Sequence, residues 1–194
     1  MDLLRIPFLF AYALAMALVE IEIEGAHGWA EKLPTWKRTR GFAARLWGAA
    51  LNGKPLTGYH AFMLPLPLFA FHLAFFEGQP WSWPAEARAL GSYFVWNVEW
   101  DFLWFLFNPA FGWRRFRRGE IWWHGRWLGR CPLDYLQAVG VSLLVAASAG
   151  LVQLRAQAFL IGGFLALTLV SALFAPAYHR WYAAMRKNSR ADPA

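Results

Sequence analysis

The sequence predicts an all-α, polytopic integral membrane protein with about five transmembrane helices. Of the 194 residues 58% are hydrophobic, only 16% are charged, and the mean hydropathy is +0.29. A water-soluble domain of this length rarely contains so little charge. The apolar residues also form runs of about 20, the length that an α-helix needs to cross about 30 Å of hydrocarbon. The basic residues, finally, concentrate in alternate loops, as they do in membrane proteins.

The first apolar run extends from Leu3 to about Ile23. It is too long for a signal peptide and ends in "EIEIEGAHGW" (20–29) rather than in a small-residue cleavage site, so we expect a retained helix. The second run, 59–76, contains Pro65 and Pro67 in "LPLPL" (64–68). Each proline removes a backbone donor, so this helix is expected to be kinked or locally unwound.

The remaining runs cover residues 90–108, 135–152 and 156–178. The last two contain "AVGVSLLVAASAG" (138–150) and "AFLIGGFLALTLVSALF" (158–174), which have no ionisable residue and many small ones. Small residues suit close helix packing, and "QLR" (153–155) is expected to link an antiparallel scaffold hairpin. We predict one bundle over residues 1–187 and a flexible cytoplasmic tail over 188–194.

The distribution of Lys and Arg predicts the orientation of the bundle. Residues 24–58, residues 109–134 and the tail together contain all but three of the 19 basic residues. With five spans these segments lie on one side, and only Arg5, Arg88 and Arg155 lie on the other. The positive-inside rule therefore predicts an outside N-terminus and a cytoplasmic C-terminus, in a bacterial inner (plasma) membrane.

The second cytoplasmic loop contains the basic segment "RRFRR" (114–118), with tryptophans close by. A positive-inside loop explains this composition better than nucleic-acid binding does, and the 13 tryptophans fit membrane interfaces. Guanidinium groups bind phosphate bidentately, so we expect this loop to hold a lipid or other phosphate-bearing headgroup. The candidate headgroup residues are Arg114, Arg115, Arg117 and Arg118. A single cysteine, Cys131, excludes a disulfide framework within the chain.

The third run carries two carboxylates, Glu99 and Asp101, in "WNVEWDFLWFLFNP" (96–109). A charged side chain in the bilayer interior costs a few kcal/mol even on permissive scales, and such residues are usually functional. Apart from Arg5 at the far end of the first run, the apolar runs contain no Lys or Arg to neutralise them. A metal ion would keep several carboxylates ionised together. Hydrogen-bonded neutral acids are the alternative.

Further candidate ligands gather at the cytoplasmic ends of the first three runs. Glu20, Glu24 and His27 are spaced i, i+4 and i+7 and would share one helix face, although the helix can end at Gly25. We predict a divalent ion, iron or zinc, with Glu99 as base and Asp101 as ligand or proton acceptor. The predicted metal ligands are Glu20, Glu24, His27, His60, Asp101 and His124. Asp134 is expected to cap the fourth helix.

These residues favour a membrane-embedded metal-dependent enzyme, a hydrolase or an oxidoreductase, that acts on a lipid or another hydrophobic substrate. Five scattered histidines are too few for the eight-histidine pattern of membrane desaturases, and the sequence contains no phosphate-binding Gly-rich loop or nucleophile elbow. Two alternatives remain open. One is a proton- or ion-coupled transporter with a relay through Glu99, Asp101 and His60. The other is an accessory subunit that binds a pigment or haem. The oligomeric state is not predicted.

Overall fold

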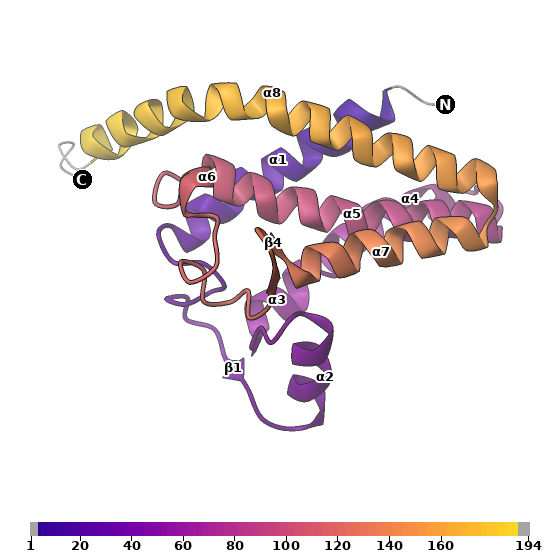
Figure 1. The fold of residues 1–194 in the computed structure, drawn as a ribbon, viewed down its shortest axis with the longest axis horizontal. Coiled ribbons are helices and arrows are strands. Elements are labelled where there is room, and N and C mark those ends of the chain that lie inside the picture. Colours follow the sequence, from indigo (N-terminus) through magenta and orange to yellow (C-terminus); the bar gives the residue numbers. More distant parts are fainter. Residues whose placement is uncertain (1–3, 190–194) are drawn as a thin grey trace.

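The structure, a computed structural model, describes residues 4–189 as a mainly helical bundle with a smaller loop layer at one end (Figure 1). Two pairs of two-residue strands are antiparallel: β1 (Lys37–Arg38) with β2 (Leu56–Thr57), and β3 (Trp127–Leu128) with β4 (Cys131–Pro132). The helices are α1 (Arg5–Glu24), α2 (Phe42–Ala50), α3 (Gly58–Met63), α4 (Leu66–Phe76), α5 (Trp83–Phe107), α6 (Gly112–Arg115), α7 (Leu133–Ser148) and α8 (Leu151–Ser189).

Three helical segments among residues 4–189 are long and apolar enough to cross a membrane: Arg5–Glu24, Gly58–Phe76 and Leu151–Lys187. This agrees with the predicted first, second and fifth runs and with membrane localisation. The third run forms α5, which is 25 residues long but contains Glu99 and Asp101. The fourth run forms α7, whose 16 residues fall short of the roughly 20 that span the hydrocarbon.

Helix α5 is the centre of the bundle and packs against α1, α4, α7 and α8. Figure 1 shows α5 between α8 and α7. Its inner face is aromatic: Trp96 is fully buried, stacks on Tyr12 and donates its indole N–H to the Leu9 carbonyl of α1 at 2.9 Å. The burial of so many rings explains why α5 is tightly held although its carboxylates weaken its apolar character.

The hairpin of α7 and α8 differs from the predicted one in where it turns. The link expected at residues 153–155 lies instead at Ala149–Gly150, where Gly150 adopts φ 105°. A glycine reaches this left-handed region without steric cost, so the turn forms there. Helix α8 then continues through Pro176 as far as Ser189, so the predicted tail begins inside a helix. Residues 190–194 of that tail lie outside the described residues.

The predicted break in the second run is confirmed, because α3 ends at Met63 and α4 begins at Leu66. Pro65 is the N-cap of α4 and Pro67 lies in its first turn, where a missing N–H costs little. The Tyr93 hydroxyl of α5 donates to the Leu64 carbonyl at 2.7 Å. A protein group thus satisfies a carbonyl at the break, which an apolar environment requires.

We expect Tyr93→Phe to lower the free energy of unfolding by about 1 kcal/mol, because the Leu64 carbonyl loses its donor. Thermal unfolding in detergent measures this change. Tyr178→Phe is the matched control, since the Tyr178 hydroxyl makes no hydrogen bond to any residue among 4–189. Equal melting temperatures for the two variants would contradict the prediction.

Two long connections, residues 25–57 and 108–132, fold together beneath one end of the bundle. Asn52 joins them: its side-chain amide donates to the Arg126 carbonyl at 2.9 Å and accepts from the Arg126 backbone N–H at 3.0 Å. In the first connection, the Trp29 indole donates to the Pro55 carbonyl at 2.9 Å. These bonds fold the first connection on itself and join it to the second connection, near the candidate site.

Candidate functional site

The two carboxylates of Glu20 and Glu24 lie one turn apart at the end of α1, and both are buried. His60 of α3 faces them. Its Nε2 atom lies 4.0 Å from Glu20 Oε1 and 3.9 Å from Glu24 Oε1. One ligand atom from each of the three residues lies within 4.8 Å of the other two. We call these three residues the Glu–Glu–His cluster.

The imidazole of His60 is held from two sides, so that Nε2 points at the carboxylates. Thr57 is the N-cap of α3; its hydroxyl oxygen accepts from the His60 backbone N–H at 3.2 Å and lies 2.8 Å from His60 Nδ1. Trp29 stacks on the ring with centroids 3.7 Å apart and an interplanar angle of 11°. Among residues 4–189, the two carboxylates are the groups that Nε2 faces, and both are beyond hydrogen-bonding distance.

Glu24 is positioned by a strained turn that follows α1. Trp29 and Ala30 adopt φ values of 54° and 52°, a left-handed conformation that costs non-glycine residues about 1–2 kcal/mol each. The turn directs the Ala30 backbone N–H at Glu24 Oε1, 2.5 Å away. Backbone strain of this kind is concentrated at functional sites in proteins. Glu20 accepts a longer hydrogen bond, 3.3 Å, from the Tyr59 hydroxyl.

A second polar group forms around His124 in the loop before α7. Its Nδ1 atom lies 3.1 and 3.0 Å from the two carboxylate oxygens of Asp134, and its Nε2 atom lies 3.3 Å from Asp101 Oδ2. The Tyr135 hydroxyl donates a short hydrogen bond to the same Asp101 oxygen. His124 therefore lies between two carboxylates, in an arrangement that can hold a proton and pass it on.

Lys54 supplies a buried cation that the apolar runs lack. It comes from the first connection, and its Nζ atom lies 2.8 Å from Asp134 Oδ2 and 4.5 Å from the centre of the Trp29 ring. Burial raises the pKa of Asp134, but the hydrogen bond from His124 and the Lys54 ammonium outweigh burial and hold this pKa below its ordinary value. Asp134 lies in the first turn of α7 but is not its N-cap, since its side chain binds Lys54, His124 and Asn52 rather than the backbone of that turn.

Both groups face a cavity of about 170 Å³. Its polar wall combines members of the Glu–Glu–His cluster with the aspartates and Lys54: Glu20, His60, Lys54, Asp101, Asp134 and Tyr135. Its other wall is mainly apolar and lies between the α3–α4 break, α5 and α7: Leu64, Phe94, Val98 and Ala138. A ligand in this cavity would contact carboxylates at one end and hydrocarbon at the other.

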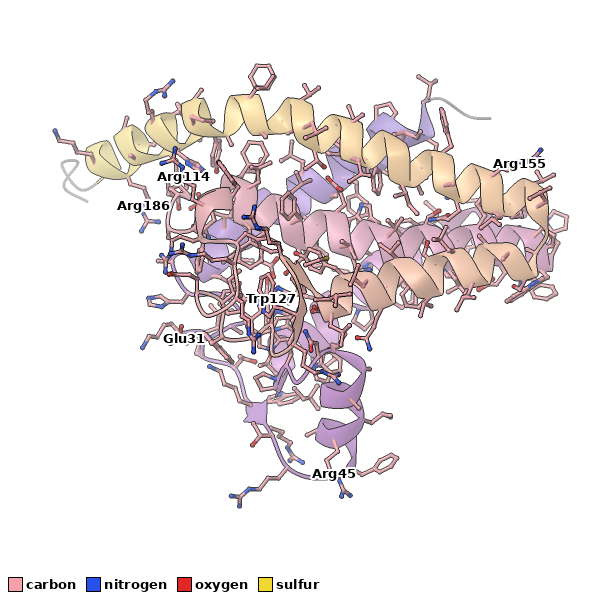
Figure 2. All side chains as sticks on the ribbon, in the orientation of Figure 1. Glu31, Arg45, Arg114, Trp127, Arg155 and Arg186 are labelled. Atoms are coloured by element: carbon pink, nitrogen blue, oxygen red, sulfur yellow. The ribbon has the colours of Figure 1, made fainter. Side chains whose placement is uncertain are left out.

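Several predicted site residues lie away from the cavity. Helix α1 ends at Glu24 and Gly25 turns with φ 61°, so His27 leaves the shared face and pairs with Glu31 at 3.5 Å on the surface. Glu99 faces α8 and accepts from the Thr168 hydroxyl at 2.5 Å. The four candidate headgroup arginines lie outside the cavity wall, and two of them, Arg115 and Arg117, pair with Glu120 at 3.3 and 3.1 Å. Figure 2 labels Arg114 beside α6, below α8.

No protein-family model, curated protein or solved structure matches this chain. The residues that line the cavity therefore carry the functional argument.

Proposed function

We propose that the protein is a membrane-embedded, metal-dependent enzyme that acts on a lipid or another hydrophobic substrate. The observation that carries this proposal is the Glu–Glu–His cluster, in which three buried ligand atoms converge beside a cavity. Two carboxylates and one imidazole are a ligand set typical of Zn²⁺, Mn²⁺ or Fe²⁺. Three protein ligands leave coordination positions open to water or substrate, as catalytic metal sites require.

A bound cation would also reduce the electrostatic repulsion within the Glu–Glu–His cluster. Two buried carboxylates repel one another, and burial penalises their charged forms. The ammonium of Lys54 already pairs with Asp134 at 2.8 Å, so it neutralises little of the charge of Glu20 and Glu24. A divalent ion between the carboxylates and His60 Nε2 would keep both acids ionised.

The group around His124 supports a catalytic role for this ion, because it supplies proton transfer next to the cluster. Asp101 lines the cavity and has His124 and then Asp134 behind it. A divalent ion polarises carbonyl or phosphoryl oxygens and acidifies water. Asp101, ionised beside His124, would accept a proton from water or substrate. Of the two reaction classes expected from the sequence, this arrangement favours hydrolysis.

The apolar wall of the cavity supports a substrate with a hydrocarbon part. This wall contains Leu64, Phe94, Val98 and Ala138, and the outer surface of the bundle is rich in exposed Leu and Phe. A chain bound against this wall would place its polar end at the Glu–Glu–His cluster. We assign this end of the bundle to the cytoplasmic side from the basic residues of residues 24–58 and 109–134. The exposed arginines 114–118 would then contact anionic headgroups there.

Elemental analysis of the detergent-purified protein tests the metal site. Wild-type protein is expected to retain a transition metal near one equivalent, whereas Glu24→Gln and His60→Gln are expected to lose most of it. Each variant removes one of the three proposed metal ligands, and the glutamine that replaces it carries no charge to compensate for the loss.

Glu99→Gln is the matched control, because Glu99 is an equally buried glutamate that faces Thr168 rather than the cluster. It should retain the metal. Absence of metal from all four proteins would refute the enzyme as proposed and favour proton-coupled transport. An absorbing chromophore in the purified wild type would favour the accessory-subunit alternative instead.

A further inference from the structure

The three basic residues that the sequence assigns to the outer side meet around one cavity. Arg5 begins α1, Arg88 lies in the second turn of α5, and Arg155 lies in the second turn of α8. Together with Gln153 and five apolar residues they line a space of about 460 Å³, which is larger than the cavity beside the Glu–Glu–His cluster. Figure 2 shows Arg155 at the end of the bundle away from Arg114 and Arg186.

The described residues around this cavity carry charge of one sign. Among residues 4–189, its wall contains three guanidinium groups and no carboxylate. Arg5 is fixed by donating to the Ser92 hydroxyl at 2.7 Å and to the Arg88 carbonyl at 3.4 Å. The side chains of Arg88 and Arg155 form no ion pair with any residue among 4–189. Arg88 and Arg155 thus bring two positive charges to one space, and a bound anion would lower the repulsion between them.

The backbone adds to this positive potential. Arg5 is the first residue of α1, and the first turn of α8 contributes Val152 and Gln153 to the cavity wall. The amide groups at a helix start carry partial positive charge and favour anions. Two helix starts therefore act on the same cavity as the three arginines.

The remaining wall indicates what kind of anion fits. It is formed by Ile6, Val152, Ala156, Phe159 and Leu160, and Val152 is 75% exposed and Phe159 42% exposed. Apolar surface beside arginines suits a ligand that joins an anionic group to hydrocarbon. Helix α1 has 20 residues and is thus about 30 Å long from Arg5 to Glu24, roughly the thickness of a bilayer core. The arginines thus lie at headgroup level if α1 spans the membrane.

We propose that Arg5, Arg88 and Arg155 form a binding site for a phosphate group, carried by an anionic membrane lipid, on the side opposite the Glu–Glu–His cluster. Guanidinium forks bind phosphate oxygens in pairs, which a single ammonium group cannot do. The site does not depend on the metal or on the enzymatic proposal, since it shares no residue with the other cavity.

Native mass spectrometry of the delipidated protein tests this site, with dioleoyl phosphatidylglycerol and dioleoylglycerol as probes. The two probes share their acyl chains and differ in the phosphate. Wild-type protein is expected to bind the phospholipid at least about tenfold more tightly than dioleoylglycerol, and Arg88→Gln/Arg155→Gln is expected to lose that preference. Both arginines are exposed, so the double variant should keep the melting temperature of the wild type.

Arg38→Gln/Arg45→Gln is the matched control, because it removes two exposed arginines in the first connection and changes the net charge equally. It should bind phosphatidylglycerol as the wild type does. Displacement of bound phosphatidylglycerol by millimolar inorganic phosphate would assign the site to free phosphate. Phosphatidylglycerol that stays bound under these conditions would assign the site to the lipid. Equal binding of the two probes to wild type, or unchanged phospholipid binding in Arg88→Gln/Arg155→Gln, would overturn the proposal.

Discussion

Replacing Lys54 by methionine is expected to lower the free energy of unfolding by about 3–5 kcal/mol. Lys54 and Asp134 are both buried and their charged atoms lie 2.8 Å apart. Methionine fills much of the same volume but leaves Asp134 as a buried carboxylate without its cation. The contact between the ammonium and the Trp29 ring is lost as well, and that ring supports His60.

Thermal unfolding in detergent measures the loss, and two further variants identify its cause. Lys54→Met/Asp134→Asn removes both charges, while an amide can still accept hydrogen bonds from Asn52 and His124, so it should recover most of the lost stability. Lys37→Met changes a lysine that is exposed, and should stay within about 0.5 kcal/mol of wild type. A double variant as unstable as Lys54→Met would show that packing rather than charge holds this region.

The sequence predicted those features that depend on regular helix geometry. Spacings of i and i+4 put Glu20 and Glu24 on one face of α1 without any tertiary information. The same geometry separates Glu99 from Asp101, which are two residues apart and therefore point to different sides of α5. One faces Thr168 of α8 and the other faces Tyr135 of α7. The two prolines likewise determined the break between α3 and α4.

The features that the sequence missed depend on irregular backbone. His27 lies away from the Glu–Glu–His cluster because α1 ends at Glu24. Helix ends are the least reliable part of a sequence-based assignment. Lys54 lies beside Asp134 in a region where Asn52 bonds to Arg126, 74 residues further along the chain. The apolar runs themselves contain no Lys or Arg near Glu99 and Asp101, so their pattern does not indicate this cation. A signal was nevertheless present: "NGKPLTGYH" (52–60) contains turn residues immediately before the His60 helix.

The membrane-spanning segments, too, were predicted only where local sequence is sufficient. Runs of hydrophobic residues predicted the lengths of α1 and of the α3–α4 segment, since length and composition suffice there. They did not predict that α5 is the central helix, because its role depends on which rings pack against it. The carboxylates and tryptophans of α5 lower its hydropathy, while the burial of Trp96, Trp100 and Trp104 places this helix in the core.

The largest effect on activity is expected from Asp101→Asn, which should retain the metal and reduce turnover by about 10²–10⁴-fold. The Asp101 carboxylate accepts a hydrogen bond from Tyr135 and lies 3.3 Å from His124 Nε2, so it is engaged by a different set of groups from Glu20, Glu24 and His60. An amide keeps the shape and can accept the Tyr135 hydrogen bond, but it cannot take up a proton. His60→Gln, in contrast, should lose metal and activity together.

Vesicles of mixed phospholipid supply the substrates for this comparison, and mass spectrometry of the products reports turnover beside the metal content of each variant. The pair of measurements separates two roles that the sequence assigned to Asp101 together, ligand and proton acceptor. Loss of metal in Asp101→Asn would make it a fourth ligand and extend the Glu–Glu–His cluster across the cavity. Full turnover with full metal would exclude Asp101 from the chemistry, and would leave a structural role for its contacts with His124 of the second connection and Tyr135 of α7.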